Sequence, residues 1–182
     1  MDDWFLMRLL GPLLLAAGED DLLKSLLFGK KRDLEEGRAY LVKERKPAKA
    51  LEHFRRAVER GFRPLFVTRQ HPNHLHQVSG GREIRVVWLS TSLGKDYVDP
   101  HNLNSLSNLI SNFVADGDHA VVLLDGIEYL MMNNDFSRIL HFLELASEQV
   151  AMRRAILLLS LDDRAFDPKE LALLERNMVV LD

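Results

Sequence analysis

Small polar and charged side chains follow four apolar, β-branched runs in this chain, and their types could support ligand binding or catalysis. The runs span residues 64–67, 84–89, 120–124 and 155–159. Near-continuous apolar runs of this length are typical of strands in a parallel sheet that is covered on both faces. Ligands of such sheets bind outside the carboxyl ends of the strands. The candidate ligand site at this edge consists of Thr68, Arg69, Ser90, Thr91, Ser92, Lys95, Asp125, Glu128, Asp162 and Arg164.

Asp125 is the strongest candidate for metal-linked chemistry. Four apolar residues followed by an acid have the form of a Walker B strand, whose acid holds a magnesium ion or its water. Glu128 lies close enough in the sequence to polarise a water. Any buried strand can end in Asp, however, because the carboxylate also caps the following turn. A structural role is therefore favoured, and we expect no catalytic residue, no bound metal and no cofactor.

A phosphate-binding loop, the usual companion of a Walker B strand, is missing. Such a loop has the form G-x-x-x-x-G-K-[ST], whereas the turn at residues 42–48 contains no glycine. Without glycine the backbone cannot easily wrap around a phosphate. Gly94 and Lys95 match only half of the motif and precede an extended stretch. The sequence therefore argues against ATP hydrolysis.

Two arginines at strand ends have the chemistry to bind an anion through paired hydrogen bonds. Arg69 and Arg164 each lie near an acid in the predicted rim, so ion pairs with Asp125 or Asp162 are the favoured role.

Three histidines, His71, His74 and His76, have a spacing that resembles a metal site. Pro72 prevents a regular helix across them, and no carboxylate lies inside the run. Surface or interface positions are therefore favoured over a zinc site.

Alternating strands and helices must bring the candidate side chains to one edge. Strands are expected at residues 38–42, 64–67, 84–89, 120–124, 155–159 and 178–181. Helices are expected to begin at Pro47, after Asp99 or Asn102, after Asn134 or Asp135, and at Asp167-Pro168, each with apolar residues at helical spacing. This order predicts an α/β fold, a Rossmann-like or RecA-like three-layer sandwich with a mainly parallel sheet of about five or six strands.

The composition excludes several classes of protein. With 182 residues, of which 47% are hydrophobic, the chain can form one medium domain and a small appendage. A net charge of -3 argues against a nucleic-acid partner. The absence of cysteine excludes disulfides and thiolate metal sites, and it is compatible with a cytoplasmic location.

Residues 1–32 are predicted to form an apolar helical appendage with a charged linker, ahead of an α/β domain at residues 33–182. The uncharged run at residues 9–18 is about half as long as a membrane span. The acidic cluster at residues 19–21 argues against a helix that lies on a membrane surface. Packing on the chain's own domain and pairing with another chain are equally favoured, whereas membrane-surface contact is less favoured.

We predict that the appendage mediates association, as a homodimer or with a partner protein. Its candidate interface residues are Trp4, Phe5, Leu9, Leu10, Leu23, Leu26, Leu27 and Phe28.

Four segments in order resemble a known family. They are EGRAYLV at residues 36–42, WLSTSLGKDY at residues 88–97, LLDGIEYL at residues 123–130 and LALLE at residues 171–175. Together they resemble an archaeal family catalogued as domain of unknown function number eight-three-five, found alone or fused to sensor and membrane segments. The resemblance covers about Leu34 to Asp182 and implies no established activity. More distantly, the layout resembles RecA-like and KaiC-like ATPases, whose phosphate loop this chain lacks.

Two hypotheses of function follow. The first is a non-catalytic signalling or protein-interaction module that self-associates and binds a protein segment or a small effector at the strand ends. It rests on the missing phosphate loop, on the lack of a visible nucleophile and base pair, and on the apolar appendage. The alternative is a divergent nucleotide-binding or NTP-hydrolysing enzyme that uses Asp125, with Glu128 and Lys95 at the same edge.

Overall fold

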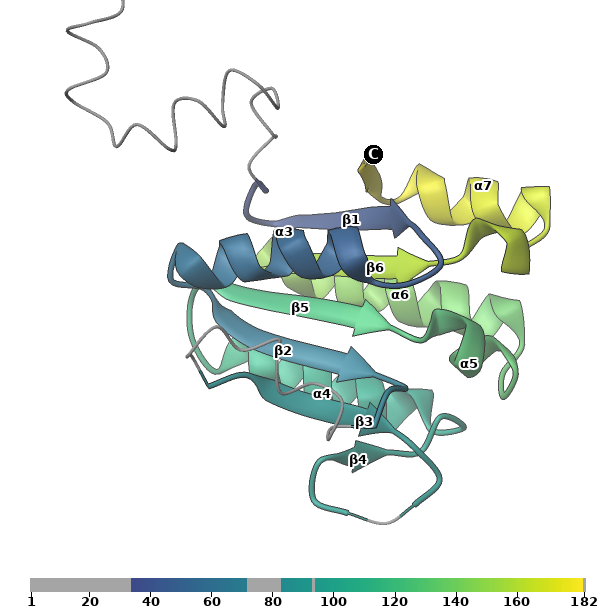
Figure 1. Cartoon of the computed structure of the whole chain (residues 1–182), viewed down its shortest axis with the longest axis horizontal. Coiled ribbons are helices and arrows are strands. Elements are labelled where there is room, and N and C mark those ends of the chain that lie inside the picture. The colour runs from purple at the N-terminus through teal and green to yellow at the C-terminus, as the bar shows by residue number, and fades with distance from the viewer. Residues whose placement is uncertain (1–33, 72–82, 93, 182) are drawn as a thin grey trace, which may run out of the picture. The chain divides into compact units, whose positions relative to one another are not determined.

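Strands and helices alternate along the chain, as the sequence predicts. The computed structural model describes residues 34–71, 83–92 and 94–181 (Figure 1). Its strands are β1 (Arg38–Lys43), β2 (Arg63–Thr68), β3 (Arg85–Leu89), β4 (Tyr97–Val98), β5 (Ala120–Asp125), β6 (Ile156–Leu161) and β7 (Val179–Leu181). Its helices are α3 (Ala48–Glu59), α4 (Leu103–Ala115), α5 (Ile127–Met131), α6 (Phe136–Met152) and α7 (Pro168–Arg176), with a short 3-10 helix η2 (Asp163–Ala165). None of the helices in these ranges is long and apolar enough to cross a membrane.

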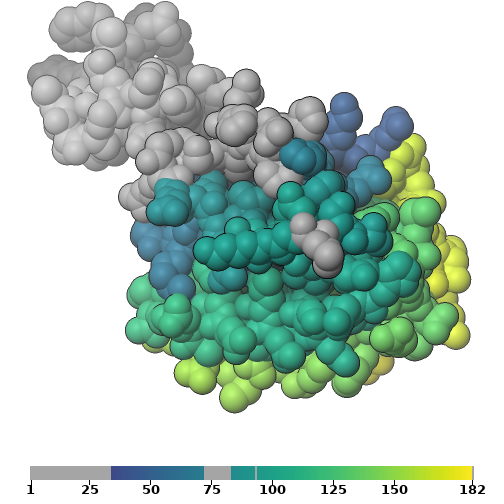
Figure 2. Space-filling view, turned by 90° about the horizontal axis from the view of Figure 1, so that it is seen from below, coloured from purple at the N-terminus to yellow at the C-terminus, as the bar shows by residue number. Residues whose placement is uncertain are grey.

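The described strands form one seven-stranded sheet in the order β4-β3-β2-β5-β6-β1-β7, and every pairing is parallel. The expected α/β fold is confirmed, with a strand count slightly above the predicted five or six. The extra strand is β4, whose two residues pair with Trp88 and Leu89 of β3. Seen from below, the teal atoms of the segment from β3 to α4 cover the middle of this side of the molecule (Figure 2).

Helices cover both faces of the sheet, because the strands are apolar on both sides. Helix α3 lies in front of the sheet in Figure 1, and α4 and α6 lie behind it. On the α3 side, the core contains Ala50, Phe54, Ala57 and Val58 of the helix and Tyr40, Val42, Phe66, Val121, Leu123, Ile156 and Leu158 of the strands. On the other side, alternate strand residues such as Leu65, Val122 and Leu157 pack with Leu106, Ile110, Ile139, Leu143 and Leu174 of the helices.

Local capping signals begin two of the helices where the sequence places them. The Asn102 side chain accepts a hydrogen bond from the Ser105 amide and caps α4. Asp167 and Glu170 form a reciprocal capping box at the start of α7, with Pro168 at the first position. Helix α6 begins after Asp135 as expected, but the Asp135 side chain forms no capping hydrogen bond. Helix α3 follows Pro47, whose side chain has no acceptor for the first amides.

The chain leaves the carboxyl ends of the neighbouring strands β1 and β6 toward opposite faces of the sheet, β1 to α3 and β6 to α7. In parallel sheets, ligands bind at the carboxyl edge where such a divergence occurs. Although β1 and β2 are consecutive strands, β5 and β6 separate them, so α3 crosses over two strands.

Candidate functional site

One register row places three polar residues side by side at the carboxyl edge. Thr68 of β2 pairs with Asp125 of β5, which in turn pairs with Ser160 of β6. The buried Thr68 hydroxyl donates to Asp125 Oδ2 at 3.0 Å and accepts from the Gln70 amide at 3.0 Å. Since parallel strands in register end together, three sequence-distant segments meet in this row.

Asp125, the middle residue of this row, is half-buried, and the pKa of its carboxyl group is shifted. Burial raises the pKa of Asp125 above its ordinary value, because the charged form loses hydration. The hydrogen bond from Thr68 and the positive charge of Arg69 lower the pKa of Asp125. The negative charges of Glu128 and Glu44 raise it further. The charges of Glu128 and Glu44 therefore both reach Asp125 at the carboxyl edge.

Glu44, which the sequence analysis does not place in the site, accepts hydrogen bonds from three different residues. Its Oε2 accepts from the Lys49 amide at 2.7 Å, and its Oε1 accepts from the Ala50 amide at 2.9 Å and from the Ser160 hydroxyl at 3.2 Å. A carboxylate thus binds the positive end of α3 beside the carboxyl end of β6. This is the position at which helix N-termini bind phosphate in other proteins.

Sequence alone held one signal for Glu44. Pro47 cannot cap α3 with its side chain, so the first amides of the helix need an acceptor from elsewhere. Glu44 lies only five residues before Lys49 and is the acid nearest to this helix start. Its contact with Ser160, 116 residues away, has no local signature.

Glu128 and Asp162 join the ends of β5 and β6. Glu128 Oε1 accepts from the Asp162 amide at 2.6 Å. The Arg164 guanidinium donates two hydrogen bonds to the Asp162 carboxylate, from Nε to Oδ1 at 2.8 Å and from Nη2 to Oδ2 at 2.5 Å. These hydrogen bonds hold the pKa of Asp162 well below its usual range, at about 2. The predicted pairing of Arg164 with Asp162 within the rim is therefore confirmed.

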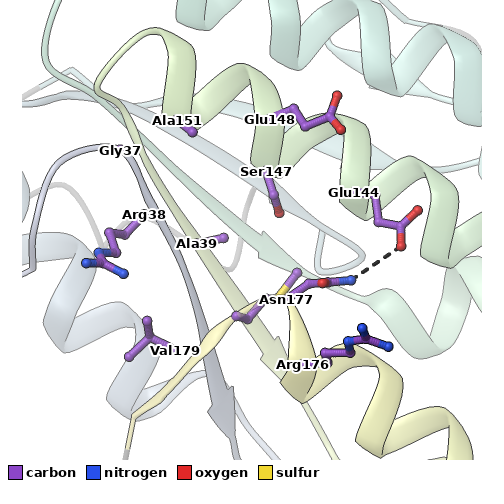
Figure 3. A pocket seen from close by; sticks show the side chains of 11 residues that line it. Gly37, Arg38, Ala39, Glu144, Ser147, Glu148, Ala151, Arg176, Asn177 and Val179 are labelled. Carbon is purple, nitrogen blue, oxygen red and sulfur yellow. Dashed lines mark hydrogen bonds between the residues drawn. The ribbon is translucent and has the colours of Figure 1, made fainter.

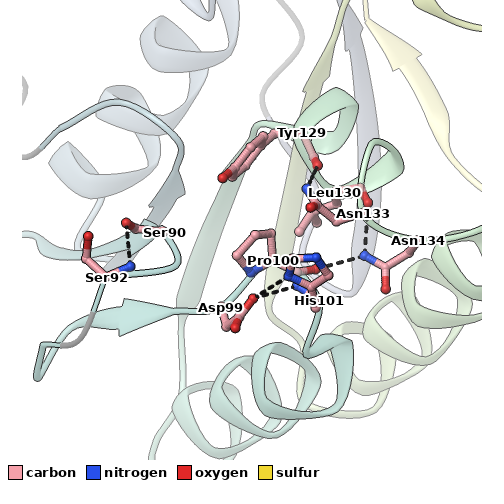
Figure 4. Close-up of polar contacts among 9 residues, drawn as sticks. All are labelled: Ser90, Ser92, Asp99, Pro100, His101, Tyr129, Leu130, Asn133 and Asn134. Atoms are coloured by element: carbon pink, nitrogen blue, oxygen red, sulfur yellow. Dashed lines mark hydrogen bonds and ion pairs between the residues drawn. The ribbon is translucent and has the colours of Figure 1, made fainter.

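The other predicted residues lie apart from this network. Arg69 is exposed, and its charge reaches Asp125, while its carbonyl accepts from the Trp88 indole at 2.9 Å. Ser90 accepts from the Ser92 amide at 3.1 Å in the turn after β3 (Figure 4). Thr91 and Lys95 are exposed in the loop between β3 and β4. The structure thus joins Thr68, Asp125, Glu128, Asp162 and Arg164 with Glu44, and leaves the β3–β4 loop outside that network.

Polar contacts tie the turn before α4 to the turn before α6 (Figure 4). Asn134 donates to the carbonyls of Pro100 and Leu130 at 2.8 and 2.9 Å. Asp99 binds both the amide and the ring of His101, and these bonds lower the pKa of Asp99. The contacts therefore brace the loops on the β4 side of the candidate site.

An open groove of about 710 Å³ lies at the opposite, amino end of β1. Its walls are the last two turns of α6 and the chain that joins α7 to β7 (Figure 3). Glu144 of α6 accepts from Asn177 at 3.3 Å across one side of the groove. Glu148, Arg38 and Arg176 add charges of both signs. The groove is a separate feature, since the predicted site is at the carboxyl ends of the strands.

Metal-ligand geometry is not found in the described ranges, where no three His, Asp or Glu side chains converge. His71 packs edge-on against Trp88, with ring centroids 4.7 Å apart. His74 and His76 lie outside the described residues. The interface candidates of residues 4–28 also lie outside them.

Comparison with known proteins identifies one family. A family model with the description "Protein of unknown function (DUF835)" matches residues 43–178. This match spans Glu44 and all ten predicted site residues, but it does not include the β1 residues that line the amino-end groove. No curated protein matches the chain.

Proposed function

Because this chain belongs to the DUF835 family, described as proteins of unknown function, we propose a function from the carboxyl edge of its sheet. The protein is a non-catalytic α/β signalling module that binds a protein segment or a small effector at this edge. The observation that carries the proposal is the occupation of the α3 N-terminus by Glu44. A carboxylate that accepts from Lys49 and Ala50 opposes a nucleotide phosphate by charge repulsion and by competition for the same amides.

The remaining acids of the edge support the same conclusion. Asp125 accepts from Thr68, and Glu128 accepts from the Asp162 amide. A Walker B-type mechanism would need Asp125 to hold a magnesium ion and Glu128 to orient a water. Glu128 is instead used to join the ends of β5 and β6, which suits a rigid binding surface better than a catalytic centre.

Nucleotide turnover provides the test. Full-length protein is incubated with ATP, GTP and magnesium, and phosphate release is measured over many enzyme equivalents, with Asp125→Ala as the matched variant. We expect no turnover by either protein. Hydrolysis by the natural chain that disappears in the Asp125→Ala variant would overturn the proposal.

The alternative is a divergent nucleotide-binding or hydrolysing enzyme with a RecA-like layout. It is favoured by one observation, the half-buried Asp125 at the end of a central strand with Glu128 in electrostatic reach. A nucleotide that binds only the folded state raises the melting temperature by mass action. A shift at millimolar nucleotide with magnesium that is lost in Asp125→Ala favours this alternative, whereas an unchanged melting temperature excludes it.

Association through the N-terminal appendage completes the proposal. The apolar residues between Trp4 and Phe28 are suited to contact with a second copy or a partner protein. We place the protein in the cytoplasm, with contact at a membrane surface as the less favoured alternative. Its net charge of -3 does not favour nucleic acid as a partner.

A further inference from the structure

Three cationic side chains flank the start of α3, and the charge of one of them, Arg45, reaches Asp162 and helps to lower its pKa. Arg45, Lys46 and Lys49 are exposed, and none of them forms an ion pair or a side-chain hydrogen bond within the described part of the chain. All three lie within residues 45–49, between the end of β1 and the first turn of α3. We call Arg45, Lys46 and Lys49 the basic patch.

The position of the basic patch is unfavourable for the isolated fold. A helix N-terminus carries a partial positive charge, so cations there are destabilising and acids are preferred. Helix α3 has no acidic residue in its first turn, and Lys49 lies within that turn. Among the described residues, Glu44 is the acid that binds the α3 amides. Local rules of this kind are commonly broken where a surface serves binding.

The acids near the basic patch already form hydrogen bonds with other residues of the chain. Glu44 is held by two amides and Ser160, Asp162 is held by Arg164, and Glu128 is held by the Asp162 amide. Lys43 is neutralised by Glu175. Because Glu44 already occupies the amides of α3, an additional anion would be bound by the three side chains and not by the helix end.

The charge around the patch selects among anionic partners. Asp163, Asp167 and Glu170 follow β6 at the same edge, and the whole chain carries a net charge of -3. A long, uniformly anionic polymer or membrane would meet these acids as well as the patch. A short acidic segment can contact the cations of the basic patch and end before it reaches these neighbouring acids. Such a segment also fits the proposed role of the carboxyl edge in binding protein segments.

We propose that Arg45, Lys46 and Lys49 form a docking surface for a short acidic segment, rich in Asp or Glu, of a partner protein. This inference rests on the proposed function and names the class of partner that the carboxyl edge binds.

Binding of a labelled polyglutamate peptide of about four residues, short enough to contact the basic patch alone, to the full-length protein tests the proposal by fluorescence anisotropy at low salt. The patch variant is R45Q/K46Q/K49Q. The matched control is R85Q/R153Q/R176Q, which removes the same amount of charge. These three arginines are exposed, at the start of β3 and at the ends of α6 and α7, and they form no ion pair within the described residues. An oligothymidylate and phosphatidylserine vesicles serve as competing anions.

We expect the patch variant to bind the peptide about tenfold more weakly and the control variant to stay within about twofold of the natural chain. The patch variant should also melt no lower than the natural chain, since it loses a cation from a helix start. Equal weakening of both variants, no peptide binding by the natural chain, or tighter patch-dependent binding of the oligonucleotide or vesicles would overturn the proposal. None of these results bears on nucleotide turnover, which alone overturns the non-catalytic function.

Discussion

Individual carboxylates at the carboxyl edge differ in what the fold does to their charge. Arg164 stabilises the charged form of Asp162, whereas burial and the nearby charge of Glu128 destabilise the charged form of Asp125. Asp125 retains one strong partner, the Thr68 hydroxyl. A half-buried acid of this kind costs stability when it is ionised, and such perturbed groups are common in ligand sites.

Replacement of Asp125 by Asn should stabilise the protein at neutral pH. Asn keeps an oxygen that accepts from Thr68 and removes the poorly hydrated charge, so we expect the melting temperature to rise by a few degrees. Because folding raises the pKa of Asp125, its protonated form favours the folded state. The protonated form of Asp125 therefore contributes its full stabilisation below the pKa of the unfolded chain, near 3.8. This stabilisation is lost as the pH rises through the higher pKa of the folded state. The advantage of Asp125→Asn should therefore shrink on acidification.

Urea unfolding near pH 7 and near pH 4 measures this difference. Asp163→Asn, at an exposed position of η2, is the control and should change the free energy of unfolding by less than about 0.5 kcal/mol at either pH. If Asp125→Asn is less stable than the natural protein at neutral pH, yet equal to it in acid, the ionised Asp125 carboxylate does not destabilise the fold.

At the scale of elements, the start of α3 depends on an acid from the preceding loop. Pro47 occupies the N-cap without a side-chain acceptor, so Glu44 supplies acceptors to the second and third residues of the helix. It also accepts from Ser160 and thereby links α3 to β6. The same side chain therefore caps a helix and joins two elements that are distant in the sequence.

Removal of this acceptor should weaken the fold. We expect Glu44→Ala to lower the free energy of unfolding by about 1–2 kcal/mol, since two helix amides lose their partners. Glu44→Gln should cost about half as much, because the neutral amide oxygen still accepts one of the hydrogen bonds.

Urea denaturation of both variants, with Glu59→Ala in the last turn of α3 as the control, provides the measurement. Glu59 is exposed, and its replacement should change the stability by less than about 0.5 kcal/mol. If Glu44→Ala unfolds at the same urea concentration as the natural chain, Glu44 is not the cap of α3.

At the scale of the whole molecule, the α/β fold begins at Leu34, and the appendage before it is the part proposed for association. We expect the full chain to be a dimer in solution and a chain that begins at Asp33 to be a monomer, because the truncation removes the apolar residues from Trp4 to Phe28. Light scattering coupled to gel filtration gives both masses. Monomers in both cases would refute self-association, and liposome pelleting of the full chain alone would instead indicate membrane contact.

The sequence by itself determined which segments become strands and where the helices begin. Apolar runs of four to six residues, the cap at Asn102 and the capping box at Asp167 are local signals, and each depends on residues within a few positions of one another. The placement of Asp125 at the end of a buried strand follows from the same local pattern. For this reason the predicted order of elements agrees with the structure, apart from β4, α5 and η2, which are not predicted and are too short to show periodicity.

Only the tertiary structure decided which strand ends become neighbours. Periodicity indicates that a strand is buried on both faces, but it carries no information on which strand lies beside it. The order β5-β6-β1 brings Glu44 to Ser160 and Glu128 to the amide of Asp162, although these pairs are 116 and 34 residues apart. The same order leaves Ser90, Ser92 and Lys95 on the far side of β2. The site therefore depends on long-range packing of the strands, whereas its individual residues follow from local chemistry.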